Sequence, residues 1–125
     1  MKTIAQLINW DFEANGNLEI KDKKGDLIYH EFSNGFWEKS EYDSQGNVIY
    51  FENSDGFWEK TEYNYKGNKI YYEISDGFWT KWEYDSEGNE IYYEDSDDQI
   101  VDNRHKPSEN KVIEIDGVKY KLIEL

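Results

Sequence analysis

The stretch that decides the fold is residues 54–74, "SDGFWEKTEYNYKGNKIYYEI". The same unit precedes it at 33–53 and follows it at 75–95, and twelve of its twenty-one positions are identical in all three copies. Each copy holds two turn signals, separated by segments rich in Trp, Tyr, Phe and Ile, the composition typical of β-strands. Each copy is therefore predicted to form two antiparallel strands, and the array to form a β-meander.

The two turn signals differ in kind. The first is an Asn-Gly or Asp-Gly pair, at 34–35, 55–56 and 76–77, which predicts a two-residue hairpin loop with positive φ at both residues. The second is an Asp or Asn with Gly three positions later, which predicts a type I turn followed by a left-handed glycine. The glycines of this second signal are Gly46, Gly67 and Gly88.

The predicted loops fix which residues face each other. If Asp55 and Gly56 alone form the loop, Glu52 lies opposite Glu59, and the same rule places Glu31 opposite Glu38. With this register both faces of the sheet carry aromatic and charged residues, unlike the apolar-in, polar-out alternation of a sandwich. We therefore expect one twisted sheet, held by aromatic ladders on both faces. Neutralising the facing glutamates should then leave stability unchanged or raise it.

The rest of the chain extends this pattern into a single predicted domain, 1–125. Residues 1–32 are expected to form an N-terminal cap and a degenerate repeat, with a short helix that begins after Thr3. Residues 33–95 are the three repeats, and 96–110 are expected to be a loop. Residues 111–125 are expected to form a C-terminal hairpin.

Two further Asn-Gly or Asp-Gly pairs lie outside the full copies. Asn15-Gly16 is predicted to turn a shortened hairpin, and Asp116-Gly117 to turn the C-terminal one. The predicted fold is therefore all-β, a single twisted antiparallel meander of 21-residue repeats with a short N-terminal helix and about ten strands in total.

Composition limits the partners. The chain has 28 acidic and 14 basic residues, a net charge of -14, which disfavours direct binding to nucleic acid or anionic membrane and favours basic protein partners. There is no cysteine, and no apolar run approaches the ~20 residues that span a bilayer. The N-terminal apolar stretch is too short for a secretory leader, so we expect a cytoplasmic protein, in the host cell if a phage encodes it.

The core of the array, residues 41–68, resembles the YD (RHS-type) repeats. The likeness rests on a Tyr-Asp or Tyr-Asn pair followed by Gly in the pattern YDxxGN, at 42–47, 63–68 and 84–89. The resemblance implies a β-repeat sheet of the kind that spirals into large shells around toxins, although three copies are too few for a shell. A weaker likeness connects the Trp, Tyr and Gly content to choline- or glucan-binding repeat modules of cell walls.

Nothing in the sequence indicates catalysis. The two histidines, His30 and His105, belong to no metal-spaced motif, and a repeated glutamate pair on an open sheet lacks the cleft that a glycosidase needs. The turns resemble calcium loops only in part, because the ligand pattern of an EF-hand is incomplete. We therefore expect no enzyme activity, no metal and no cofactor.

The leading functional hypothesis is a non-enzymatic, acidic protein-binding module. By size and charge the chain is similar to small acidic phage inhibitors of CRISPR or restriction enzymes, which implies mimicry of nucleic acid in the basic groove of a nucleic-acid-binding protein. The alternative is an aromatic repeat module that binds carbohydrate or choline or has a structural role. The candidate binding residues are four glutamates and three tryptophans, namely Glu38, Glu52, Glu59, Glu73, Trp37, Trp58 and Trp79. The identity of the partner and the oligomeric state do not follow from the sequence.

Overall fold

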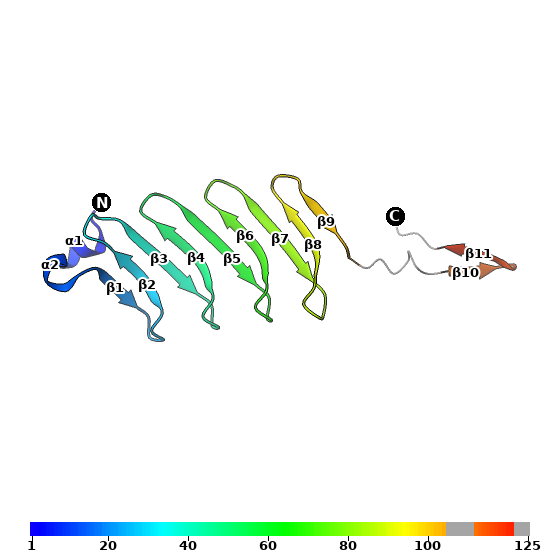
Figure 1. Cartoon of the computed structure of the whole chain (residues 1–125), viewed down its shortest axis with the longest axis horizontal. Helices are drawn as coiled ribbons and strands as arrows, with labels where there is room; N and C mark the ends of the chain where they lie inside the picture. The colour runs from blue at the N-terminus through cyan, green and yellow to red at the C-terminus, as the bar shows by residue number, and fades with distance from the viewer. Residues whose placement is uncertain (105–111, 122–125) are drawn as a thin grey trace.

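Most of the protein is one row of antiparallel strands with two short helices at its N-terminal end (Figure 1). The computed structural model describes residues 1–104 and 112–121. The helices and strands, with their bounds, are α1 (Ile4–Ile8), α2 (Phe12–Asn15), β1 (Leu18–Lys21), β2 (Leu27–Glu31), β3 (Trp37–Tyr42), β4 (Val48–Asn53), β5 (Trp58–Tyr63), β6 (Lys69–Ile74), β7 (Trp79–Tyr84), β8 (Glu90–Asp95), β9 (Ile100–Asp102), β10 (Val112–Ile115) and β11 (Val118–Lys121).

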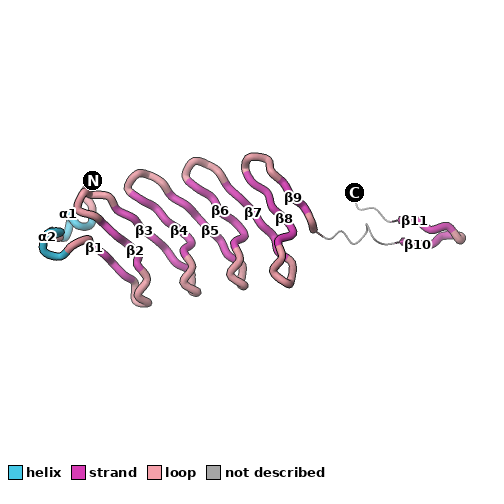
Figure 2. The backbone as a smooth tube through the Cα atoms, in the orientation of Figure 1, coloured by secondary structure: helices cyan, strands magenta, loops and turns pink. Residues whose placement is uncertain are grey.

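The predicted meander is confirmed. Strands β1 to β9 pair in sequence order in one nine-stranded sheet, and β10 and β11 form a separate two-stranded sheet. The connecting turns alternate between the two ends of the strands, as the tube in Figure 2 shows. A register shift between Glu41 and Tyr42 recurs at the equivalent places of the two later copies, so every repeat carries the same irregularity beside its second turn.

Both kinds of turn in the repeat are three-residue loops. At the first signal, the Asn53 N–H donates to the Phe57 carbonyl at 2.9 Å and the Gly56 N–H donates to the Asn53 carbonyl at 3.1 Å. Gly56 has φ +87°, whereas Asp55 is not among the positive-φ residues, so the loop is a type I turn closed by a left-handed glycine. The predicted two-residue loop is therefore wrong here, while the predicted positive φ of Gly67 and its equivalents is confirmed.

Serine accounts for the extra loop residue. The Ser54 N–H donates to the Trp37 carbonyl at 3.0 Å, and Ser54 Oγ accepts from the Trp37 N–H at 3.1 Å. Ser96 makes the same two bonds to Trp79. Ser75 makes the backbone bond alone, to the Trp58 carbonyl at 2.9 Å. Each of these three serines thus satisfies a backbone group of the preceding hairpin from inside the loop.

The longer loop shifts the register by one residue and exchanges the faces. Glu52 lies opposite Trp58, and Phe51 lies opposite Glu59. The predicted Glu52–Glu59 pair is therefore wrong, because residues that were expected to share a face point to opposite sides of the sheet. The predicted pair of Glu31 and Glu38 fails in the same way, since Glu31 lies opposite Trp37 and Glu38 lies opposite His30.

The N-terminal helices cap the first strands. Thr3 accepts from the Gln6 N–H, and the Gln6 side chain accepts from the Thr3 N–H, so the expected helix start is confirmed as a capping box. The hairpin predicted at Asn15-Gly16 is wrong, because these residues end α2 instead. Asp11 starts α2 by accepting backbone N–H groups of the first turn, a role that suits this residue type.

The buried apolar residues gather under this cap. Ala5, Leu18 and Tyr29 are the buried hydrophobic residues of the described chain. Half-buried apolar neighbours from the two helices, the connection between them, β1 and β3 pack against these residues, namely Ile4, Trp10, Phe12, Ile20 and Trp37. Beyond this cluster the sheet is one layer thick with partly exposed side chains on both faces, as expected. Among the described residues, no helix is both long enough and apolar enough to cross a membrane.

The C-terminal part departs from the expectation in one respect. Strand β9 lies inside the segment that was predicted to be a loop, and pairs with β8 through a fourth turn of the repeat type. In that turn Asp98 has φ +66°, where the full copies have glycine. Asp116 and Gly117 both have positive φ between the paired residues Ile115 and Val118, which confirms the two-residue C-terminal hairpin. His105 lies outside the described residues.

Candidate binding surfaces

The three predicted tryptophans lie on one face of the sheet, here called the tryptophan face. Trp37, Trp58 and Trp79 begin β3, β5 and β7, and each is half-buried. A lysine two residues later lies over each ring, with Nζ to centroid distances of 5.2 Å, 5.3 Å and 4.9 Å. At these distances the three lysines make cation–π contacts with the tryptophans.

The remaining residues of the tryptophan face are tyrosines and glutamates. The Tyr71 hydroxyl donates to Glu73 at 2.9 Å, and the Tyr92 hydroxyl donates to Glu94 at 2.7 Å. In the preceding copy, Lys39 Nζ lies 3.3 Å from the carboxylate of Glu52. The five positions of this face, namely Trp, Lys, Glu, Tyr and Glu, are the same in all three copies, which fits a ladder that holds successive hairpins together.

Each end of the tryptophan face is covered by a different element. At the N-terminal end, Glu31 is 2% exposed and accepts from the Ala5 N–H at 3.1 Å and the Tyr29 hydroxyl at 2.7 Å. At the other end, Arg104 lies over the Tyr92 ring at 4.2 Å and donates to the carboxylates of Glu83 and Asp102. The middle repeats lie open between these two ends.

The opposite face differs from copy to copy, and we call it the variable face. Among its six strand positions in each repeat, only the tyrosine at 42, 63 and 84 is constant. The Tyr42 and Tyr84 hydroxyls donate to backbone carbonyls of the preceding strand, which accounts for that constancy. The positions that vary are 38/59/80, 40/61/82, 48/69/90, 51/72/93 and 53/74/95.

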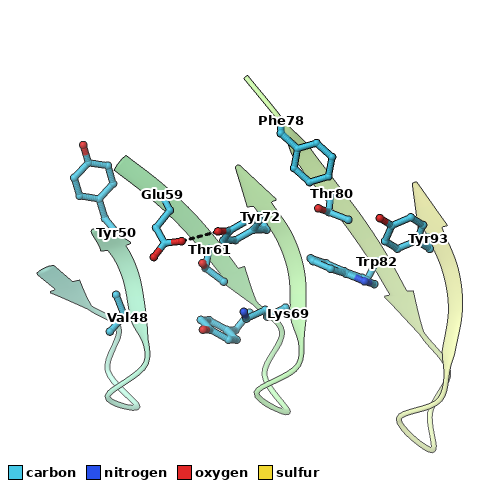
Figure 3. A pocket seen from close by; sticks show the side chains of 11 residues that line it. Val48, Tyr50, Glu59, Thr61, Lys69, Tyr72, Phe78, Thr80, Trp82 and Tyr93 are labelled. Carbon is cyan, nitrogen blue, oxygen red and sulfur yellow. Dashed lines mark hydrogen bonds between the residues drawn. The ribbon is translucent and has the colours of Figure 1, made fainter. Parts of the chain in front are cut away.

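A concavity of about 460 Å³ lies on the variable face, across β4 to β8 (Figure 3). The buried side chains of Thr61 and Thr80 lie on neighbouring odd-numbered strands, and both are paired with Tyr72 of the strand between them. Aromatic rings surround them, with Trp82 and Tyr93 packed edge to face at a centroid distance of 6.1 Å. The concavity is therefore polar in its middle and aromatic at its rim.

Two tyrosine–carboxylate pairs order this region. The Tyr72 hydroxyl donates to Glu59 Oε2 at 2.6 Å, the dashed line in Figure 3. This hydrogen bond, together with burial and the charge of Glu59, raises the pKa of Tyr72 to about 12. The Tyr93 hydroxyl donates to Asp95 at 2.6 Å, and this bond lowers the pKa of Asp95 although burial opposes it. Each of these carboxylates therefore accepts a hydrogen bond from a tyrosine of its own or the neighbouring strand.

The predicted site residues fall into two groups. Glu52, Glu73 and the three tryptophans share the tryptophan face, whereas Glu38 and Glu59 lie on the variable face. Sequence reasoning missed Trp82 and the two threonines of the concavity. The signal was present, because 82 is the strand position at which a Ser or Thr of the earlier copies gives way to Trp.

Neither a histidine nor an acidic cluster marks a metal site in the part of the chain that the structure describes. No group of three or more His, Cys, Asp or Glu residues there is placed to hold a metal ion. The His30 ring packs on Phe32 with a centroid distance of 4.3 Å, and its Nε2 lies 3.9 Å from the Glu19 carboxylate.

The comparisons with known proteins bear on the fold. The chain matches no protein-family model and no curated protein sequence. Among solved structures it is similar to a crystal structure of TcdB2-TccC3-TEV, with a TM-score of 0.53 and 19% sequence identity. The match covers 67% of this chain and only 4% of that one. At this identity the similarity concerns the fold alone, and it agrees with an open array of antiparallel strands.

Proposed function

We propose that the chain is a non-enzymatic binding module that presents its acidic repeat sheet to a basic protein surface. The observation that carries this proposal is the open, single-layer sheet in a chain of net charge -14. A sheet without a covering layer leaves much of both faces open to solvent between the N-terminal cap and Arg104, so most charged groups of the middle repeats are accessible. Catalysis by a pair of carboxylates has little support, because Glu52 and Glu59 lie on opposite faces.

The charge density of the repeats supports a partner protein whose basic groove ordinarily holds nucleic acid. Residues 33–95 hold 15 acidic and 5 basic residues, a net charge of -10. Their six strands span roughly 29 Å at ~4.8 Å per strand, which gives one net charge per ~3 Å. A single DNA strand carries one charge per ~3.4 Å. The sharper proposal is therefore that the chain is an inhibitor of the kind that phages encode, and that its sheet occupies the basic channel of a nucleic-acid-binding protein.

A second candidate function is the binding of carbohydrate or choline by the tryptophans. Its support is the regular placement of Trp37, Trp58 and Trp79 at equivalent positions of alternate strands, as stacking sites require. Against it, a lysine already lies over each ring, so a ligand would have to displace that lysine or use the other ring face.

The test of the leading proposal is affinity capture from cell lysate, with elution by rising salt and mass spectrometry of the eluate. We expect basic nucleic-acid-binding proteins to elute at moderate salt, because exposed charges are screened within ~8 Å at physiological ionic strength. Added DNA should compete with the chain for these proteins, while the chain alone should not bind DNA. A partner whose retention is indifferent to both salt and DNA would overturn the proposal.

A further inference from the structure

The variation between the copies is confined, within the paired strands, to the variable face. The tryptophan face repeats the same five residues in every copy, although nothing in the twenty-one-residue period requires one face to vary more than the other. In repeat proteins the constant positions maintain the stacking of units, and the extended surface of the array provides the binding site. The variable face is thus the surface on which this array differs from a uniform repeat.

The concavity is the part of the variable face where the copy-specific residues meet. Thr80 stands where the earlier copies have glutamate, so the third copy loses a charge and gains a small side chain. Trp82 stands where the earlier copies have Ser or Thr. The first change leaves room at Thr80, and the second adds an aromatic ring beside Tyr93. Phe78 also lines the concavity (Figure 3).

The chemistry of the concavity suits a cation. Glu59 supplies an anion whose position is fixed by the hydrogen bond from Tyr72, and the rings of Trp82 and Tyr93 supply electron-rich faces. One cation is already bound to a ring here, since Lys69 Nζ lies 5.5 Å from the centroid of Tyr72. A planar guanidinium can stack on such rings and bond a carboxylate through two N–H groups, which a lysine ammonium cannot do.

We infer that this concavity binds an arginine side chain from a basic segment of the partner protein, with Glu59 as its counter-charge and Trp82 as its stacking wall. The inference rests on the proposed function, because it names the group by which a basic partner is recognised. The volume of about 460 Å³ exceeds one side chain and leaves room for the flanking residues of an extended segment. The net charge of -14 draws such a segment to the sheet, and the concavity selects arginine over lysine.

The test compares labelled nona-arginine and nona-lysine peptides, which carry the same charge, in titrations of the full chain at one salt concentration. We expect nona-arginine to bind about fivefold more tightly, from the additional stacking and bidentate bonding. Trp82→Thr should bring this ratio close to one. Thr is the residue that the second copy carries at this position, so the fold accommodates it. Trp82→Phe should retain much of the discrimination.

The matched control for Glu59 is Glu62, which lies on the same strand, β5, but on the other face. Glu59→Gln should weaken nona-arginine binding several-fold, whereas Glu62→Gln removes an equal charge from the tryptophan face and should weaken it much less. Thermal melts of all four variants confirm folding. Equal losses from the two Gln variants, or a ratio unchanged by Trp82→Thr, would overturn the inference.

The remaining outcomes separate the inference from the proposed function. Salt-sensitive binding of both peptides with equal affinity would leave the acidic module standing and refute the arginine site. Failure of the wild-type chain to bind either peptide would refute both. Salt-insensitive binding of maltoheptaose or chitohexaose that is lost in Trp82→Thr would assign the concavity to neutral sugars instead.

Discussion

One glutamate position of the repeat shows how environment decides what a residue does. Glu31 is buried under the N-terminal cap, Glu52 pairs with Lys39, and Glu73 accepts from Tyr71. All three stand two residues after the same tyrosine position of the unit. Only Glu31 therefore joins the cap to the sheet, since it alone among them accepts from a helix backbone N–H.

The first prediction concerns pH and Glu31. Burial by itself would raise the pKa of Glu31, but hydrogen bonds from Thr3, Tyr29 and the Ala5 N–H outweigh burial and hold the pKa below its usual value. A depressed folded-state pKa adds stability above the unfolded-state pKa of about 4.3, and this stability is lost as pH falls through the folded-state pKa. Wild-type protein should therefore lose cap stability in acid.

Glu31→Gln should flatten this dependence, because the amide keeps an acceptor oxygen but cannot titrate. At pH 7 it should destabilise by about 1–2 kcal/mol, the difference expected for hydrogen bonds to a charged group. Urea melts at pH 7 and at pH 3 measure both effects. An equally steep loss of stability in wild type and variant would show that other carboxylates account for the acid sensitivity.

The second prediction concerns the left-handed Asp98. This residue has φ +66°, at the place where Gly77 has φ +97° one repeat earlier. A left-handed backbone costs about 1–2 kcal/mol for a residue with a Cβ, less for Asp than for most. Asp98→Gly should raise stability by up to about 1 kcal/mol, and Gly77→Asp should lower it by a similar amount. Thermal melts of the two variants should move in opposite directions, and a shift of the same sign in both would contradict the strain argument.

At the scale of elements, the hairpins were predictable but their loop length was not. Alternating aromatic strands and glycine turns identify the meander, and the Asp116-Gly117 hairpin follows the two-residue rule. In the repeats, Ser54 makes the loop one residue longer, because its backbone and hydroxyl bond across to Trp37. That contact joins residues seventeen apart, and local turn propensity contains no information about it.

This one-residue error decided which residues of the site could be predicted. The tryptophans were placed together because they are equivalent in the period, and equivalence does not depend on register. The glutamate pairs and the concavity depend on register, so Glu52 and Glu59 were predicted to share a face, whereas they lie on opposite faces. The helix α2 was missed because Asn15-Gly16 ends a helix as readily as it turns a hairpin.

The third prediction tests the serine. Ser54→Ala removes the acceptor for the Trp37 N–H and should destabilise by about 1 kcal/mol, the usual net value of such a bond. Deleting Ser54 would leave Asp55 and Gly56 as a two-residue loop and force the register that the sequence suggested. That deletion should be far more damaging, since it turns every side chain of one strand to the other face. A deletion variant as stable as Ser54→Ala would show that register is only weakly specified.

At the scale of the whole molecule, the sheet is stabilised by neighbours rather than by a common core. Each strand of the nine-stranded sheet pairs with the strand next in sequence, and the buried apolar cluster is confined to the N-terminal end. Stability in such arrays is approximately a sum over units and their interfaces. In the middle repeats, a change of charge therefore alters stability without a buried apolar core beneath it to offset the change.

The last prediction sets local contacts against overall repulsion. Replacing Glu52, Glu59 and Glu73 by Gln reduces the net charge from -14 to -11 by removing three negative charges. If these glutamates faced one another, as the sequence suggested, the substitutions would stabilise the protein. In the structure, however, Glu52 pairs with Lys39 at 3.3 Å and Glu59 accepts from the Tyr72 hydroxyl at 2.6 Å. The lost contacts are short-range, whereas the repulsion that is relieved acts over distances at which salt screens it.

The triple variant should therefore be less stable than wild type by about 1 kcal/mol in total, a modest loss because exposed ion pairs contribute 0–1 kcal/mol each. Its association with a basic partner should also slow, and the difference from wild type should vanish at high salt because steering is screened. Chemical melts and stopped-flow association on the same variant separate the two effects. A variant more stable than wild type at low salt would mean that repulsion between the carboxylates outweighs the contacts named here, and that the acidic surface is held under electrostatic strain.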